Sequence, residues 1–203
     1  ILSLPVHQSI WGLLIVLFIA MVIISQFMLT FGSDPNAKVT KKSKSPLSFH
    51  PIALIFGLLS FVSYLVEGAV GDWSALYLFE DKGIVIEEAV MGVMLFNGTM
   101  CIGRLLGNRL GKHLTSKQVV VGGYLLGSIA MGLIVFLPGH ASMYTYLLLG
   151  ISLAMIVPNL FSAMGEQNVI PMTQAVATST MLGYMGILMG PALIGFIAHS
   201  TSL

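Results

Sequence analysis

An all-α membrane protein is the fold class that this sequence predicts, from its composition and from the length and pattern of its apolar stretches. Of its 203 residues, 56% are hydrophobic and 8% are charged, whereas a soluble domain usually has about a quarter of its residues charged. Its mean hydropathy is +0.94. The apolar stretches have the length of about 20 residues that a helix needs to cross a hydrocarbon core. They lack the polar–apolar alternation of barrel strands, so their backbone groups must pair within helices.

Six stretches are long enough to span a membrane, which predicts a polytopic protein with six transmembrane helices in this chain. Their approximate bounds are 9–31, 51–79, 88–110, 118–137, 143–164 and 172–198, and we number these helices one to six. Helix one is too long for the core of a signal peptide and lacks a basic leader, so we predict that it spans the membrane.

The segment 34–50 is the longest polar stretch, rich in lysine and serine. Two compatible interpretations stay open for it. It can be a flexible cytoplasmic linker, and its lysines can also contact lipid headgroups as an anchor. The other basic residues cluster at the end of helix three and in the turn that follows it. Because these two regions lie on the same side of alternating helices, the positive-inside rule makes that side cytoplasmic and places both ends of the chain outside.

Helix two carries carboxylates and glycines within its apolar run, in the stretch EGAVGDW that starts at Glu67. A polar stripe follows one face of this helix at i, i+3, i+4, i+7 and i+11: Ser60, Ser63, Tyr64, Glu67 and Gly71. Glu67 lies about 22 Å along the helix, inside the hydrocarbon. An acid at that depth indicates a proton or substrate site, or a purely structural hydrogen bond. Asp72 and Trp73 come near the outer interface and predict a gating or structural role.

Helices three and five also interrupt their apolar runs with polar residues. Helix three has a polar face at i, i+4, i+7 and i+11: Asn97, Cys101, Arg104 and Asn108. In helix five, Pro158 removes a backbone donor, so nearby polar groups must restore the pairing. Asn159 follows it, and Ser162 and Glu166 continue the same face. We predict that these faces line a polar interior.

Helix six begins with a polar stretch that includes Gln174 and then becomes rich in glycine around Tyr184. Gly186 and Gly190 form a small-xxx-small surface that lets another helix approach closely, and Pro191 follows them. By contrast, helices one and four carry no charge inside their apolar runs. We expect those two helices to be peripheral and to face lipid.

Residues for catalytic or metal chemistry do not gather in the sequence. The five histidines are far apart, and Cys101 is the only cysteine, which predicts neither a metal cluster nor an intrachain disulfide. We find no nucleophile with a base and an orienting group, so we expect no enzyme and no cofactor. The formal net charge of +1 gives no reason to expect a nucleic-acid partner.

The end of helix three, GRLLGNRLGK from Gly103 to Lys112, resembles the cytoplasmic loop signature of the major facilitator superfamily. The core of this signature would be Asn108, Arg109, Gly111 and Lys112. The sequence has Asn108 where aspartate is commoner, and its glycine spacing differs by one residue from the amino-half version, which weakens the case for a charge-relay lock. The candidates for gating or structural roles are the residues of this loop motif and those singled out above: Gly103, Arg104, Asn108, Arg109, Gly111, Asp72, Trp73, Pro158, Gly186, Gly190 and Pro191.

The order of the segments EGAVGDWSALYL, GRLLGN, GISLAMIVPNLFSAMGE and GYMGILMGPALIGFIA is similar to bacterial members near the fucose-permease-like branch. The resemblance implies a twelve-helix fold in a bacterial inner membrane. Residues 1–33 would hold the last helix of the amino-terminal half, 34–50 the central cytoplasmic linker, and 51–203 five helices of the carboxyl-terminal half, without the twelfth helix. Helices two and five would be the matching first helices of two inverted repeats, where this architecture places its binding site.

The leading functional hypothesis is a secondary active transporter, a permease or symporter, that moves a small solute by alternating access. Its expected partners are a sugar or related polar metabolite, the lipid bilayer, protons, and the amino-terminal half of the same protein. The candidate residues for the proton and substrate cavity are Glu67, Tyr64, Asn97, Asn159, Gln174 and Tyr184. Two alternatives remain: drug or metabolite efflux, and a membrane sensor or scaffold that transports nothing.

Overall fold

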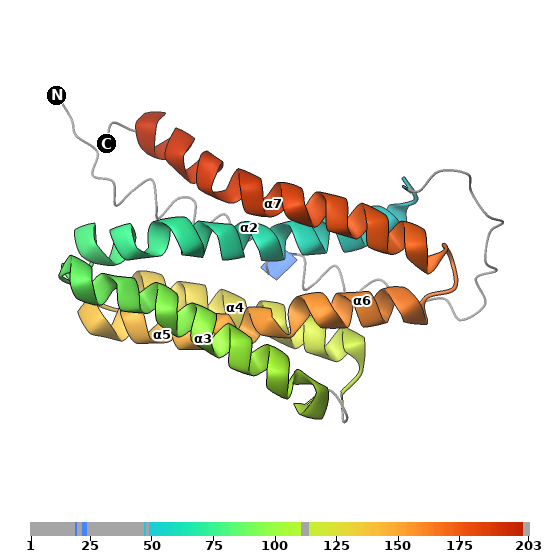
Figure 1. Cartoon of the computed structure of the whole chain (residues 1–203), viewed down its shortest axis with the longest axis horizontal. Helices are drawn as coiled ribbons and strands as arrows, with labels where there is room; N and C mark the ends of the chain where they lie inside the picture. Colours follow the sequence, from blue (N-terminus) through green and yellow to red (C-terminus); the bar gives the residue numbers. More distant parts are fainter. Residues whose placement is uncertain (1–18, 20–21, 24–46, 48, 111–113, 201–203) are drawn as a thin grey trace.

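The computed structural model describes residues 19, 22–23, 47, 49–110 and 114–200, with the side chains of 108–110 and 198–200 left aside (Figure 1). In these residues the chain forms helices and no strands. From residue 51 onward the helices are α2 Pro51–Glu80, α3 Ile86–Leu110, α4 Ser116–Phe136, α5 Gly139–Ala154, α6 Ile156–Glu166 and α7 Met172–Ser200. Five membrane spans are long and apolar enough among the described residues, with α5 and α6 together forming one of them.

The all-α fold class is therefore confirmed, and so are the five helices predicted after residue 50. Helix one, predicted at 9–31, lies outside the described residues except for Ile19, Val22 and Ile23, which are helical. The 34–50 segment lies outside them as well, apart from its last few residues. Its final residue, His50, caps α2 by accepting a hydrogen bond on Nδ1 from the Ile52 amide at 3.3 Å.

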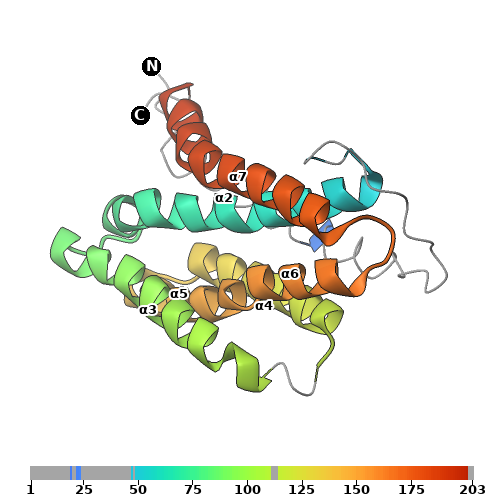
Figure 2. The same cartoon turned by 45° about the vertical axis from the view of Figure 1, so that its right-hand side comes forward.

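Helix α7 runs along α2, while α3, α4, α5 and α6 pack on the other side of α2 (Figures 1 and 2). Glycines allow the two backbones to come close. A Cβ at Gly190 would lie 2.6 Å from the Leu65 carbonyl oxygen, and one at Gly186 would overlap the Phe61 carbonyl oxygen. The small-xxx-small surface of α7 therefore lies against the α2 backbone, where any larger side chain would push the helices apart.

The span predicted as one helix at 143–164 is divided, because α5 ends at Ala154 and α6 begins at Ile156. Pro158 predicts the interruption at its own position, but the helix is broken one turn earlier, at Met155. Proline has no amide hydrogen, so the carbonyl four residues before it, that of Ala154, loses its helical partner. The Asn159 side chain compensates in part, since its Nδ2 donates to the Met155 carbonyl at 2.8 Å.

Helix α4 is as deeply buried in the bundle as α2, so the expectation that it is peripheral is wrong. The Tyr124 ring is fully buried. Its hydroxyl donates to the Leu59 carbonyl at 2.6 Å and pairs with the Ser63 hydroxyl at 2.8 Å, both on α2. A lack of charge could not distinguish a lipid-facing helix from a core helix, because both surroundings are apolar.

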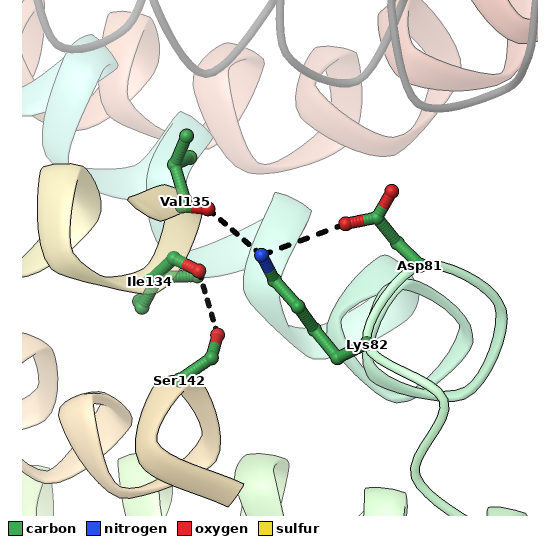
Figure 3. Close-up of polar contacts among 5 residues, drawn as sticks. All are labelled: Asp81, Lys82, Ile134, Val135 and Ser142. Atoms are coloured by element: carbon green, nitrogen blue, oxygen red, sulfur yellow. Dashed lines mark hydrogen bonds and ion pairs between the residues drawn. The ribbon is translucent and has the colours of Figure 1, made fainter. Parts of the chain in front are cut away.

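The C-terminal end of α4 is held by side chains from two other segments (Figure 3). Helical partners for the carbonyls of Ile134 and Val135 are lost because Pro138 lacks an amide hydrogen and the helix stops at Phe136. Ser142 of α5 donates to the Ile134 carbonyl at 2.6 Å. Lys82, in the turn after α2, donates to the Val135 carbonyl at 2.7 Å. This cation at a helix C-terminus also complements the helix dipole.

Candidate functional site

An ion pair joins α2 to α3 inside the membrane-spanning part of the bundle. The Nη2 atom of Arg104 lies 3.6 Å from Oε2 of Glu67. The Arg104 side chain is 47% exposed and the Glu67 side chain 25%, so neither charge is enclosed by the described residues. Helix α2 presents Glu67 on its polar stripe, and α3 presents Arg104 on the face that it shares with Asn97. At this depth the Glu67 carboxylate can take up or release a proton, and the Arg104 guanidinium can bind an anionic group.

Two tyrosines stack beside this ion pair. The rings of Tyr64 and Tyr184 lie 6.1 Å apart between centroids, with an interplanar angle of 10°. Tyr64 comes one helical turn before Glu67 on α2, and Tyr184 belongs to α7. Gly183 permits this arrangement, since a Cβ there would lie 2.7 Å from Cδ2 of Tyr64. Three of the predicted cavity residues, Tyr64, Glu67 and Tyr184, are therefore brought to one region of the bundle.

A polar pocket of about 560 Å³ opens between α3, the start of α4 and the α5–α6 break. Arg104 lines it and so connects the pocket to the ion pair. Its lining combines hydroxyl, amide and carboxylate groups with a few apolar side chains: Arg104, Gly107, Leu114, Thr115, Ser116, Ala154, Met155, Pro158, Asn159, Ser162 and Glu166. The predicted polar face of helix five, Asn159 with Ser162 and Glu166, thus faces a cavity.

Within this pocket Glu166 already has a structural partner. Its Oε1 accepts a hydrogen bond from the hydroxyl of Ser116 at 2.6 Å. Ser116 is the first residue of α4, and the positive end of a helix dipole favours a carboxylate at that point. The charge of Glu166 is therefore used to join the end of α6 to the start of α4.

The remaining cavity candidates do not join this group. Asn97 is exposed on α3 and does not line the pocket, and Gln174 is buried in the first turn of α7 away from it. Ser60, the first residue of the α2 stripe, makes a structural contact instead. Its hydroxyl pairs with that of Ser179 on α7 at 2.6 Å. Polar spacing on one helix could not reveal which neighbour each side chain meets.

Of the two gating candidates near the outer end of α2, Trp73 is held against α7 by a hydrogen bond. The indole Nε1 of Trp73 donates to the Pro191 carbonyl at 3.3 Å, while Asp72 is exposed. Gly103 of the loop signature is buried, and a Cβ there would lie 2.6 Å from the Ala154 side chain. The backbone of Asn108 and Arg109 is helical, but their side chains and all of Gly111 lie outside the described part of the chain.

The pairing of Arg104 with Glu67 is the feature of the candidate site that the sequence did not predict. The sequence places Arg104 on the polar face of helix three with Asn97 and Cys101 and in the loop motif, but it does not pair Arg104 with Glu67. The available signal was electrostatic: Arg104 lies about one and a half turns, near 9 Å, before the end of its helix, deep enough to need an acidic partner. The sequence did not identify which acid would be near it.

Four curated proteins match the chain significantly, and three of them illustrate the range. An uncharacterised MFS-type transporter of Yersinia pestis is 41% identical over 153 residues, covering 74% of this chain and 39% of the relative. Membrane protein MosC of Rhizobium meliloti is 31% identical over 151 residues, or 74% of this chain and 37% of the relative. The fosmidomycin resistance protein of Escherichia coli K12 is 26% identical over 196 residues, covering 91% of this chain and 47% of the relative.

This chain therefore spans less than half of the length of these relatives. No protein-family model matches it. No solved structure matches it significantly. The names of the relatives do not specify the fucose-permease-like branch, which stays a prediction.

Proposed function

Since this chain belongs to the major facilitator superfamily, we propose that it forms part of a secondary active transporter that moves a small solute by alternating access. The observation that carries the proposal is the Arg104–Glu67 ion pair, which lies on membrane-spanning helices and borders a polar pocket. Charged groups at membrane depth are costly, and they mark ion and substrate pathways in transporters. The proposed location is a bacterial inner membrane, and the proposed role is not that of an enzyme.

The division of the chain follows from the same proposal. Residues 51–203 would form five helices of a carboxyl-terminal half, after the last helix of the amino-terminal half at 1–33 and the central linker at 34–50. The exposed side of Arg104 and Glu67 would then face a cavity shared with the amino-terminal half. The position of Pro158 and the α5–α6 break at the pocket supports the expectation that an interrupted helix borders the site.

Glu67 is the proposed proton-coupling residue, and a sugar or related polar metabolite is the proposed solute. The test is uptake by the full-length protein in proteoliposomes, with and without an imposed proton gradient. Glu67→Gln keeps the size of the side chain but cannot release a proton, so we expect gradient-driven uptake to be lost while the fold is retained. Glu87→Gln is the matched control, because Glu87 is an exposed acid in the first turn of α3.

Two results would contradict this proposal. Unchanged gradient-driven uptake in Glu67→Gln would make Glu67 a structural residue. Failure of the wild-type protein to move any of a panel of sugars and polar metabolites, either with a gradient or by exchange, would contradict solute uptake altogether and favour a sensor or scaffold.

Efflux is the second candidate, favoured by the relative named as a fosmidomycin resistance protein. Everted membrane vesicles distinguish the two directions. An exporter would accumulate its solute in everted vesicles when a proton gradient is applied, whereas an importer would accumulate it in right-side-out vesicles. The same Glu67→Gln variant should abolish either activity if Glu67 couples transport to protons.

A further inference from the structure

The guanidinium of Arg104 has hydrogen-bonding capacity that its partner in the structure does not use. An arginine carries five N–H donors in a planar fork, yet the contact with Glu67 is a single approach at 3.6 Å. A charge-assisted hydrogen bond has a length of about 2.7–2.9 Å, so the Arg104–Glu67 distance is too long for one. Within the described residues, no hydrogen bond from this guanidinium is found, and it lines the pocket. The guanidinium therefore has donors left with which to bind a planar oxyanion.

The charges around Arg104 favour an anionic group there over a neutral one. Among the described residues that line the pocket, Arg104 is the only basic side chain and Glu166 the only acid. Glu166 is engaged by the Ser116 hydroxyl at the start of α4. The other charged group that faces Arg104 is Glu67 from α2, and the Tyr64 phenol interacts with both of these charges. Of these groups, only Glu67 competes for the guanidinium.

We propose that Arg104 binds the anionic group of the transported solute, a carboxylate or another planar oxyanion, in place of Glu67. This inference rests on the proposed transport function and names its substrate class. When the anion takes the guanidinium, Glu67 loses its partner, and an unpaired carboxylate at this depth is costly. Glu67 therefore takes up one proton from water. One negative charge and one proton enter together, so the net charge of the site does not change.

The tyrosine pair indicates what can accompany the anionic group. The Tyr184 ring is 61% exposed and stacks on Tyr64, whose helix also carries Glu67. An aromatic ring attached to the oxyanion can stack on such a surface while its charged end reaches Arg104. Benzoate is thus a suitable probe, and benzamide is its neutral counterpart of the same shape.

The experiment measures the affinity of benzoate and of benzamide for the full-length carrier in lipid nanodiscs by titration calorimetry. We expect wild-type protein to bind benzoate at least about tenfold more tightly than benzamide, the effect of one charged hydrogen-bonded contact. Arg104→Gln should weaken benzoate binding by at least about tenfold and leave benzamide unchanged. Arg104→Lys, which keeps the charge but not the fork, should give an intermediate loss.

The proton is tested by repeating the benzoate titration at mildly acidic and mildly alkaline pH. Wild-type protein should bind benzoate more tightly at the acidic pH, and Glu67→Gln should bind it with the same affinity at both. Equal binding of benzoate and benzamide by wild-type protein, no benzoate binding at all, or unchanged benzoate binding in Arg104→Gln would each overturn the anion site. A pH dependence that persists in Glu67→Gln would overturn the role of Glu67.

Failure of the transport proposal would give a different result. In that case proteoliposomes would move no solute, whatever the outcome of the nanodisc titrations. Size-exclusion profiles and helical circular dichroism of each variant distinguish a lost binding group from a lost fold.

Discussion

The guanidinium Nη2 of Arg104 on α3 lies 3.6 Å from the carboxylate Oε2 of Glu67 on α2. Helices α2 and α3 are joined by a short turn between Glu80 and Ile86, at the other end of α3 from Arg104. The ion pair thus connects the two helices far from their covalent link. A movement that separates α2 from α3 at this point would lengthen or break the ion pair. The pair is therefore suited to a site that changes between two states.

The ion pair should contribute little to stability, in contrast to its proposed role in transport. Because both side chains are partly exposed, we expect a coupling energy of about 1 kcal/mol or less. A double-mutant cycle with Glu67→Gln, Arg104→Gln and both together measures it from the thermal unfolding of the full-length protein. A coupling of about 3 kcal/mol or more would show that the pair is enclosed and mainly structural.

Gly186→Ala should destabilise the bundle because the new methyl group would overlap the Phe61 carbonyl oxygen of α2. Backbone cannot move aside as a flexible side chain can, so α7 must shift, and we expect a loss of about 1–3 kcal/mol. Gly122→Ala is the matched control, since a Cβ at Gly122 of α4 meets nothing within 4 Å. The midpoints of thermal unfolding should fall for the first variant and not for the second. Equal midpoints would contradict the close approach of α2 and α7.

Lys82→Met should weaken the outer end of the bundle. Methionine has a side chain of similar length but no ammonium group. The Val135 carbonyl therefore loses its donor. The Asp81 carboxylate, which is 5% exposed, loses the cation 3.6 Å away. We expect a loss of about 2 kcal/mol in the free energy of unfolding. Denaturation of the full-length protein in detergent measures it, and Lys82→Arg, which keeps charge and donors, should lose less. Equal stability of Lys82→Met and wild type would show that water replaces the ammonium group at Val135.

Pro158→Ala should join α5 and α6 into a more continuous helix, because alanine supplies the amide hydrogen that the Ala154 carbonyl lacks. Met155, Pro158 and Asn159 line the pocket, so we expect slower transport by a protein that is at least as stable as wild type. Uptake rate and thermal midpoint together test this. Pro171→Ala, in the loop before α7, is the control and should transport normally. Slow transport in both variants would mean that any proline loss has this effect.

The sequence was sufficient for the helices after residue 50 because lipid imposes a length and a composition that few other segments satisfy. It also pointed to Tyr64, Glu67 and Tyr184, since polar residues inside apolar helices stand out. The break at Met155 was displaced by one turn from its proline, because the lost hydrogen bond belongs to the carbonyl four residues earlier. The burial of α4 could not be predicted, because an apolar surface suits lipid and protein equally.

By itself, the sequence determined that this chain is an all-α membrane protein and which of its residues are too polar for lipid, because the cost of an unpaired polar group in hydrocarbon is local to each helix. Only the tertiary structure decided the partners: Arg104 for Glu67, Tyr184 for Tyr64, and Ser116 for Glu166. Pairing depends on how helices far apart in the chain rotate and slide against each other. Many side chains along the contact set that packing together, and periodicity along a single helix carries no information about it.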